Sequence, residues 1–280
     1  MSLNEDFVTR EFPMSTANFR HIRDVAYQMT GIILSDHKQN MIYGRLARRL
    51  RILNLTSFDD YCALLYENSP ESDDFINSIT TNLTAFFRES HHFDYLKNQV
   101  LPDIQKTNKA SRRLRIWSAG CSTGEEPYSI AMTLAEAKGF DGWDCKILAT
   151  DLDSNVVAAG KSGIYRQERV TGIPTAYNKY FKKIASEDSI EIREDVRKLI
   201  VFKQLNLLHE WPMRGMFDVI FCRNVVIYFD APTQQKLFSR YANILSENGH
   251  LFIGHSENLN RVSNAFTSLG RTIYQKSNSL

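Results

Sequence analysis

The chain has 280 residues, of which 43% are hydrophobic, with 34 lysines and arginines against 32 aspartates and glutamates. This length and composition allow one large or two ordinary domains with buried cores, and the formal net charge of +2 gives no support for nucleic-acid binding. Because the N-terminus lacks the layout of a signal peptide and the four cysteines lack C-x-x-C spacing, we predict a reduced, cytoplasmic protein. No apolar run reaches the roughly 18 residues of a membrane span, so no direct membrane insertion is expected.

Residues 1–80 carry helical signals and few strand-like runs. Apolar residues recur at spacings of three and four from Phe19 to Met29, which is typical of an amphipathic helix. Further helices are expected over about 35–53, 58–65 and 75–79. We predict that residues 1–80 form a small all-helical domain.

The second expected helix carries a basic face. Between Lys38 and Arg51 the sequence has five basic side chains and no acidic one. Three of them, Arg45, Arg48 and Arg49, lie on a different face from the apolar stripe. Such a run is usually a solvated helix face. Because crowded like charges repel each other, the alternative is that an acidic protein surface docks there.

The sequence predicts no metal site. The cysteines are scattered along the chain, at Cys62, Cys121, Cys145 and Cys222. The adjacent His91 and His92 are expected to point in different directions on a helix, and no cysteine pair accompanies them.

From Leu114 onward, strand-like runs alternate with helical patterns, which predicts an α/β domain with a mostly parallel, doubly wound sheet over residues 81–280. Strands are expected at 114–118, 146–150, 199–205, 217–222, 250–254 and 272–275. Helices are expected at 127–138, 155–161 and 233–245. The stretch from about 167 to 198 breaks the alternation, with polar and apolar residues alternating at 189–193, and predicts a small β insertion.

The turn after the first expected strand runs from Gly120 to Gly124 and is expected to hold a small molecule. Glycine lacks a Cβ, so the chain turns tightly and a ligand can approach it, while the next helix offers free amides. A dinucleotide site has G-x-G-x-x-G spacing and binds a pyrophosphate. Here Glu125 and Glu126 follow G-x-x-x-G spacing; they repel a pyrophosphate and suit an ammonium group, which favours S-adenosylmethionine over NAD. The alternative is that both glutamates only stabilise the first helical turn.

Two further strands end in polar residues. Ligands of open α/β sheets bind at the carboxyl ends of the strands, where Asp151 is placed to accept both ribose hydroxyls. The alternative for Asp151 is a helix N-cap, but Asp153 or Ser154 suits that role better. The strand at 217–222 delivers a further group of polar residues to the same edge, namely Arg223, Asn224 and Tyr228. For Tyr228, a simple core position is the alternative.

Three motifs, NLTAFFR at 82–88, GEEPYS at 124–129 and RNVVIYF at 223–229, resemble the signatures of the CheR-type chemotaxis receptor methyltransferases. The resemblance covers nearly the whole chain and implies a Rossmann-like S-adenosylmethionine-dependent domain. It implies methyl transfer to glutamate side chains on the cytoplasmic domains of chemoreceptors, with glutamyl methyl esters and S-adenosylhomocysteine as products. The receptor would be contacted through the basic helix and the β insertion, which in some members docks a short peptide at the receptor C-terminus.

The resemblance also implies roles for individual residues. The cofactor would be bound by Asn82, Thr84, Arg88, Glu125, Glu126, Asp151, Asn206, Leu207, Arg223 and Asn224. Glu126 is favoured over Glu125 for the methionine ammonium group, and Asn206 and Leu207 would flank the adenine. Arg88 would orient the substrate carboxylate and Tyr228 would line the methyl-transfer channel. A glutamate with a pKa of about 4.3 is already ionised at neutral pH, so no general base is needed.

Two other classes of function are weighed against this one. An NAD-dependent oxidoreductase is disfavoured by the absent third glycine and the paired glutamates. A non-catalytic, cofactor-sensing receptor adaptor would be expected to have lost Arg88 or Tyr228, and both are present. The sequence therefore favours a methyltransferase.

Overall fold

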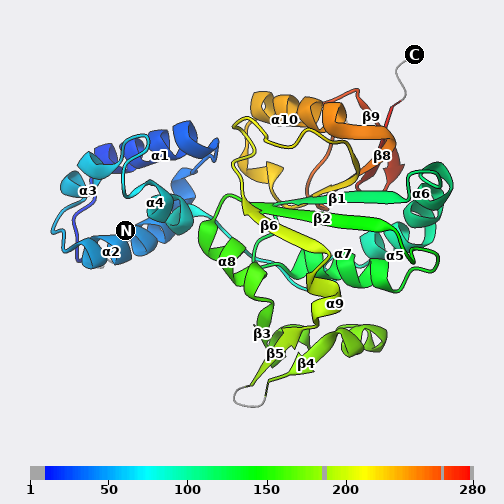
Figure 1. Ribbon diagram of the computed structural model, residues 1–280. Coiled ribbons are helices and arrows are strands. Elements are labelled where there is room, and N and C mark those ends of the chain that lie inside the picture. The colour runs from blue at the N-terminus through cyan, green and yellow to red at the C-terminus, as the bar shows by residue number, and fades with distance from the viewer. Residues whose placement is uncertain (1–9, 185–187, 260–261, 278–280) are drawn as a thin grey trace, which may run out of the picture. The chain divides into compact units, whose positions relative to one another are not determined.

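The computed structural model describes residues 10–184, 188–259 and 262–277 (Figure 1). The chain divides into two compact units, Met1–Thr80 and Thr81–Leu280. Within the described residues, no helix combines the length and the apolar composition that crossing a membrane requires.

The first unit is built from α-helices throughout its described part, which confirms the all-helical prediction. The helices are α1 (Thr16–Thr30), α2 (Gln39–Leu53), α3 (Phe58–Leu64) and α4 (Ser72–Ile79), with a 3-10 turn at Asp36–Lys38. Ser15 begins α1 by accepting a hydrogen bond from the Asn18 amide at 3.1 Å, and Gly31 ends it with a left-handed φ of 72°. The predicted apolar stripe of α1 is buried at Phe19, Ile22, Val25 and Ala26.

Two of the three arginines on the basic face of α2 have partners inside the same unit, which corrects the expectation of an open positive face. Arg45 donates to three backbone carbonyl groups at the end of α4, at 2.6 to 3.3 Å. Arg49 forms ion pairs with Glu71 and Asp74, each at 2.7 Å. Of the three arginines expected on this face, only Arg48 is exposed. The missing acidic partners come from α4 and the residue before it, which a reading of α2 alone could not supply.

The second unit is built on a seven-stranded sheet with the order β6-β2-β1-β7-β8-β10-β9. The strands are β1 (Arg113–Ala119), β2 (Asp144–Asp151), β6 (Ile200–Gln204), β7 (Phe217–Cys222), β8 (Leu245–Ile253), β9 (Phe266–Gly270) and β10 (Ile273–Lys276). The five strands from β6 to β8 are parallel, while β10 is antiparallel to both neighbours. This arrangement confirms the predicted mostly parallel α/β fold.

Helices cover both faces of this sheet. They are α5 (His91–Tyr95), α6 (Leu101–Thr107), α7 (Glu125–Ala135), α8 (Ser154–Ser162), α9 (Glu194–Arg197) and α10 (Ala231–Ile244). Figure 1 shows α10 on one face and α7 on the other. Along β1, Ile116 packs in the core cluster that contains α7, and Trp117 packs in the cluster that contains α10. This alternation buries both faces of the central strand.

Some elements differ from the sequence expectation. A helix was expected at His91 and His92, but not the long helical stretch that continues from α5 through the π-helical turn Leu96–Val100 to α6. Strand β9 was also not expected; only Phe266 of its five residues is buried, so it has little apolar signal. Strand β8 begins at Leu245, well before the expected residue 250.

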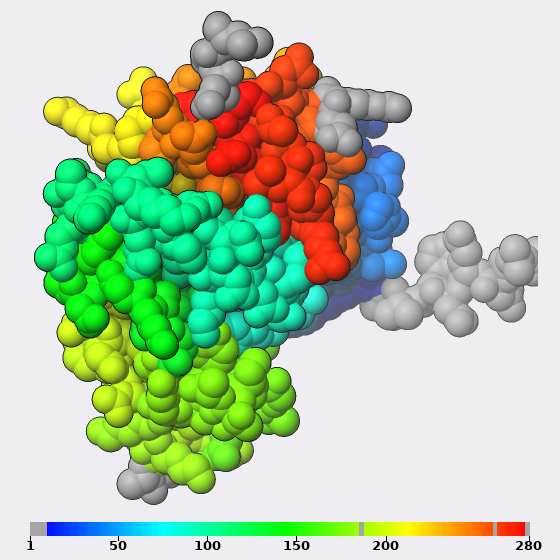
Figure 2. Space-filling view, turned by 90° about the vertical axis from the view of Figure 1, so that its right-hand side faces the viewer, coloured from blue at the N-terminus to red at the C-terminus, as the bar shows by residue number. Residues whose placement is uncertain are grey.

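The predicted insertion is a three-stranded antiparallel sheet with the order β3-β5-β4. Its strands are β3 (Ile164–Arg166), β4 (Phe181–Lys183) and β5 (Ser189–Ile192). It begins before the expected residue 167, and 3-10 turns fill Gln167–Val170 and Thr175–Tyr180. Figure 2 shows the insertion as a separate yellow-green lobe at the bottom of the view.

Candidate functional site

Polar residues follow the parallel strands at the edge of the sheet where these strands end. The registers place Ala119 of β1 opposite Thr150 of β2, and Asp151 of β2 opposite Gln204 of β6. Strand β7 lies on the other side of β1. The residues that follow β1, β2, β6 and β7 are therefore neighbours, which is the position of ligand sites in open α/β sheets.

The two glycines of the turn after β1 are needed for packing. A Cβ on Gly120 would lie 2.3 Å from Cγ2 of Val225, in the segment after β7. Gly124 has a φ of 99°, and a Cβ there would lie 2.7 Å from the Tyr165 hydroxyl and 2.9 Å from the Gly160 Cα. We expected these glycines to make room for a ligand. In the structure, the space beside each glycine is taken by neighbouring protein atoms, so the turn is fixed by its surroundings.

Asp151 is half-buried and is held by backbone amides. Its Oδ2 accepts from the Ser122 amide at 2.8 Å, and its Oδ1 accepts from the Asp153 amide at 3.1 Å. Burial raises the pKa of Asp151 to about 6, although these amides act in the opposite direction. Asp153 caps α8 by accepting from the Asn155 amide at 2.9 Å. Asp153, and not Asp151, is therefore the N-cap of α8, as expected.

Residues 82–88 lie beside the turn that follows β1, which runs from Gly120 to Gly124. The Asn82 side-chain amide donates to Asp153 at 2.7 Å, and the Asn82 carbonyl accepts from the Ser122 hydroxyl at 2.9 Å. The carbonyl group of Thr84 accepts from Arg169 at 3.1 Å. Arg88 donates to the Leu83 carbonyl at 2.8 Å. The NLTAFFR motif is thus tied to the ends of β1 and β2 and to the β insertion.

Glu125 and Glu126 have different environments at the start of α7. The carboxylate of Glu125 is fully buried, accepts from the Thr123 hydroxyl at 2.6 Å and forms an ion pair with Arg169. Because Arg169 belongs to the β insertion, this pair fixes the insertion to the start of α7. Sequence reasoning missed Arg169, because nothing in its local pattern distinguishes it from an exposed arginine.

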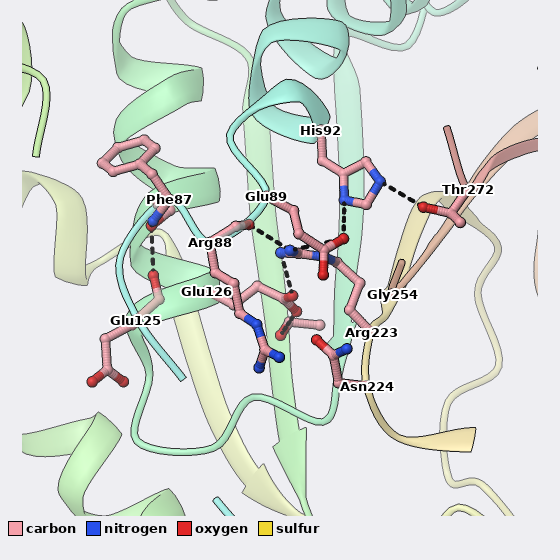
Figure 3. A network of polar contacts seen from close by, with 12 residues as sticks. Phe87, Arg88, Glu89, His92, Glu125, Glu126, Arg223, Asn224, Gly254 and Thr272 are labelled. Carbon is pink, nitrogen blue, oxygen red and sulfur yellow. Dashed lines mark hydrogen bonds and ion pairs between the residues drawn. The ribbon is translucent and has the colours of Figure 1, made fainter. Parts of the chain in front are cut away.

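Glu126 is the centre of a buried polar network (Figure 3). It accepts from the Ser118 hydroxyl at 2.7 Å and forms an ion pair with Arg223 at 3.1 Å. Arg223 is also hydrogen-bonded to the Arg88 carbonyl and lies 3.5 Å from Glu89. Burial raises the pKa of Glu126, while Arg223 and Ser118 oppose this shift. Arg223 therefore links the NLTAFFR, GEEPYS and RNVVIYF motifs.

Glu89 and two histidines extend this network. Glu89 contacts His255 at 3.0 Å and His92 at 3.6 Å, and Figure 3 shows it between Arg223 and His92. Burial lowers the pKa of His92 to about 3. The expectation that His91 and His92 diverge is wrong: their ring centroids lie 4.2 Å apart, because both side chains turn toward the carbonyl group of one residue near β10.

Glu89, His91 and His92 form a cluster of possible metal ligands, but the carboxylate of Glu89 already has other partners. The ligand atoms of Glu89, His91 and His92 lie within 4.8 Å of one another. However, the Glu89 carboxylate already faces the cationic Arg223 and contacts His255. Sequence reasoning did not single out Glu89, although it directly follows the NLTAFFR motif.

The segment after β7 carries the third predicted group. Asn224 has a left-handed φ of 59°, and Tyr228 ends a 3-10 turn, Val226–Tyr228, where it is half-buried. The backbone amides of Asn224, Val225 and Val226 all donate to Glu257 at 2.9 Å. Glu257 was not predicted, because a lone glutamate after a strand gives no sequence signal.

Asn206 and Leu207 follow β6 and lie next to the end of β2. The preceding residue, Leu205, donates its amide to the Asp151 carbonyl at 2.9 Å. The Leu207 carbonyl accepts from Arg240 at 2.6 Å and from the Trp211 indole at 3.1 Å. Four segments with predicted cofactor residues thus meet at the carboxyl edge of the sheet.

Comparisons with known proteins match both units. The family profile described as "CheR methyltransferase, SAM binding domain" matches residues 82–275, and "CheR methyltransferase, all-alpha domain" matches residues 17–80. A chemotaxis protein methyltransferase of Escherichia coli is 45% identical over 273 residues, which cover 95% of this chain and 93% of the relative. Chemotaxis protein methyltransferase 2 of Pseudomonas aeruginosa is 43% identical over 272 residues, which cover 96% of each chain.

Proposed function

The chain belongs to the CheR methyltransferase family, and we propose that it methylates glutamate side chains of chemoreceptors, forming glutamyl methyl esters. The general activity, S-adenosylmethionine-dependent methylation in chemotaxis, follows from the family and from relatives at 43 to 45% identity. Neither an NAD-dependent oxidoreductase nor a non-catalytic adaptor is supported by these matches. The proposed site of action is the cytoplasm, where the receptor domains carry their methylated glutamates.

The residues at the carboxyl edge fit this cofactor. The Asp151 carboxylate, oriented by two amides, is suited to the ribose hydroxyls. For the methionine ammonium group we propose Glu126, because Arg169 alone balances the charge of Glu125, whereas Glu126 shares Arg223 with a second acid, Glu89. The other proposed cofactor contacts are Asn82, Thr84, Arg88, Asn206, Leu207, Arg223 and Asn224.

Charge balance also supports Glu126. Its carboxylate is shared with Arg223, and Glu89 lies on the other side of the Arg223 guanidinium. The three groups carry a formal charge of −1 when both acids are ionised. A cationic ammonium group would neutralise this buried charge, and unpaired buried charge is costly.

Arg88 and Tyr228 are the proposed catalytic residues. Within the part of the chain that the structure describes, the Arg88 guanidinium donates to the Leu83 carbonyl; because a guanidinium has five N–H donors, donors remain for a substrate carboxylate. When bound, S-adenosylmethionine supplies an electrophilic methyl group and its sulfur keeps the electron pair of the broken bond. The protein then has to hold a carboxylate oxygen in line at about 3 to 3.5 Å, and Tyr228 would line that path.

We propose that the receptor is contacted by the exposed face of α2 and by the β insertion. On α2, we propose Arg48 for this contact, because Arg45 and Arg49 are engaged within the helical unit and the exposed Arg51 is paired with Glu11. In the insertion, strands β3 and β4 lie at the two edges of its sheet, so each has one side without a strand partner among the described residues. Such an edge can pair with an extended peptide.

The observation that carries the proposed function is the convergence of the three motifs on Arg223. The test is incubation with methyl-labelled S-adenosylmethionine and receptor-containing membranes, followed by mild alkali. Glutamyl methyl esters should release volatile labelled methanol. Label that enters the receptor but stays non-volatile after alkali would show that the product is not an ester.

A further inference from the structure

Glu257 joins the segments that follow β7 and β8. It is 5% exposed and lies shortly after the end of β8. Its Oε2 accepts from the amides of Gly254 and Asn224 at 2.5 and 2.9 Å. Its Oε1 accepts from the amides of Val225 and Val226, both at 2.9 Å. Each carboxylate oxygen thus takes two backbone donors, which is the full capacity of an ionised carboxylate.

The segment held by Glu257, residues 224–226, has backbone amides that need a hydrogen-bond acceptor from elsewhere in the chain. Asn224 has a φ of 59°, so its amide and the next two point in directions that no helix or strand satisfies. The segments also approach very closely: a Cβ on Gly254 would lie 2.4 Å from the Asn224 side-chain nitrogen and 2.8 Å from its amide nitrogen. An anion between the two segments satisfies these donors where water has little room.

The segment also carries the proposed machinery on both sides. Arg223 and Asn224 begin it, and Tyr228 follows the three amides by a 3-10 turn. The Val225 amide donates a hydrogen bond to Glu257, and the Val225 side chain packs against Gly120 in the turn after β1. A change at Glu257 would therefore be transmitted to both the cofactor turn and Tyr228.

From these contacts, and on the basis of the proposed function, we propose that Glu257 is a positioning residue that holds Asn224 and Tyr228 in their working geometry. It acts through the backbone and does not touch the reacting atoms. Burial raises the pKa of Glu257, and the backbone amides counter this shift.

The test compares Glu257→Gln and Glu257→Asp with Glu247→Gln, which changes an exposed glutamate of β8. Calorimetry with S-adenosylhomocysteine separates two effects, because a misfolded fraction lowers the stoichiometry while lost positioning raises the Kd. The rate of methyl transfer to receptor in a single turnover, normalised to the amount of bound cofactor, shows whether Tyr228 is still correctly positioned.

For Glu257→Gln, we expect an unchanged stoichiometry, a Kd raised about fivefold and a single-turnover rate about tenfold lower, because the amide group presents a donor to amide donors. Glu257→Asp should recover part of both effects, and Glu247→Gln should match the wild type. Hydrogen exchange of the Asn224, Val225 and Val226 amides should accelerate in Glu257→Gln.

The proposal is overturned if Kd and normalised rate stay within twofold of the wild type, or if only the stoichiometry falls. If Glu257→Gln does not fold, Glu257→Asp decides by the same criteria. Hydrogen exchange and calorimetry test the role of Glu257 even if the methyl acceptor is not glutamate, because neither measurement involves the acceptor. Failure of the proposed function would instead appear as missing methyl ester with the wild-type protein.

Discussion

Arg169 of the β insertion forms an ion pair with the fully buried carboxylate of Glu125 at the start of α7. The same guanidinium also donates to the Thr84 carbonyl at 3.1 Å. One side chain thus connects the insertion, the cofactor turn and the NLTAFFR motif. The insertion is therefore coupled to the site by charge as well as by packing.

Arg169→Gln should destabilise the second unit, because it leaves Glu125 buried without its cation. The expected loss in the free energy of unfolding is about 2 kcal/mol, measured by urea denaturation. Arg166→Gln is a matched control, because Arg166 is an exposed arginine of β3 whose 3.8 Å ion pair with Glu168 joins two exposed side chains.

The double variant Arg169→Gln with Glu125→Gln should recover part of the lost stability, since no charge is then left unpaired. If Arg169→Gln is as stable as the control, the ion pair contributes nothing to the coupling of insertion and site.

The affinity for S-adenosylhomocysteine should fall as the pH drops through about 6. The pKa of Asp151 is raised to about 6, so its carboxylate is ionised at pH 7.5 and largely protonated at pH 5. A protonated acid is a weaker acceptor for ribose hydroxyls. Calorimetry across this range should show a Kd rise on the order of tenfold, and Asp151→Asn should bind weakly with little dependence on pH.

The free energy of unfolding of the cofactor-free protein should change with pH in the opposite direction to the cofactor affinity: the Asp151 contribution should increase as the pH falls. Because the folded pKa lies above the unfolded value of about 3.9, the folded state binds the proton more tightly between these two values. This group therefore adds stability as the pH falls from about 6 toward 4. A difference in the pH dependence of unfolding between wild type and Asp151→Asn measures it, and identical profiles would contradict the raised pKa.

The fold was largely predictable because its signals are local. The strands β1 and β7 are largely buried apolar runs and β2 has an apolar centre, while turn glycines and capping residues such as Asp153 mark the strand ends. Strand β9 was missed because four of its five residues are exposed and it carries no apolar alternation. Its pairing with β10 is a tertiary effect that local propensity does not record.

The site was predictable where a motif carries several chemical groups together. The partners that hold those groups were not: Arg169, Glu89 and Glu257 each act across a long sequence separation. The same reason explains the error on α2, where Arg49 looked unpaired because Glu71 is distant in sequence. A single sequence shows the charges but not which of them meet.

Tyr228→Phe should lower turnover more than cofactor affinity. The ring of Tyr228 remains in this variant, so the 3-10 turn is kept while the hydroxyl group is lost. We expect kcat to fall on the order of tenfold with the Kd for S-adenosylhomocysteine within twofold. Tyr66→Phe, at a 57% exposed tyrosine of the helical unit, is the control. Equal losses of affinity and turnover would assign Tyr228 to cofactor binding.

The two neighbouring arginines Arg48 and Arg49 should have separable effects. Arg49→Gln leaves Glu71 buried without its cation, so the helical unit should lose about 3 kcal/mol of stability, measured by thermal and urea unfolding. Arg48→Glu should leave stability unchanged, because Arg48 is exposed. If the exposed face of α2 contacts an acidic receptor surface, Arg48→Glu should raise the KM for receptor-containing membranes several-fold.

The effect of Arg48→Glu should shrink at high salt, because exposed charges are screened within about 10 Å at 0.1 M ionic strength. Its affinity for S-adenosylhomocysteine should equal that of the wild type, since the substitution lies in the helical unit. A KM that does not change, or a raised KM that is independent of salt, would place the receptor contact elsewhere. The remaining proposed contact would then be the β insertion, whose edge strands each have one side without a strand partner among the described residues, where an extended peptide could pair.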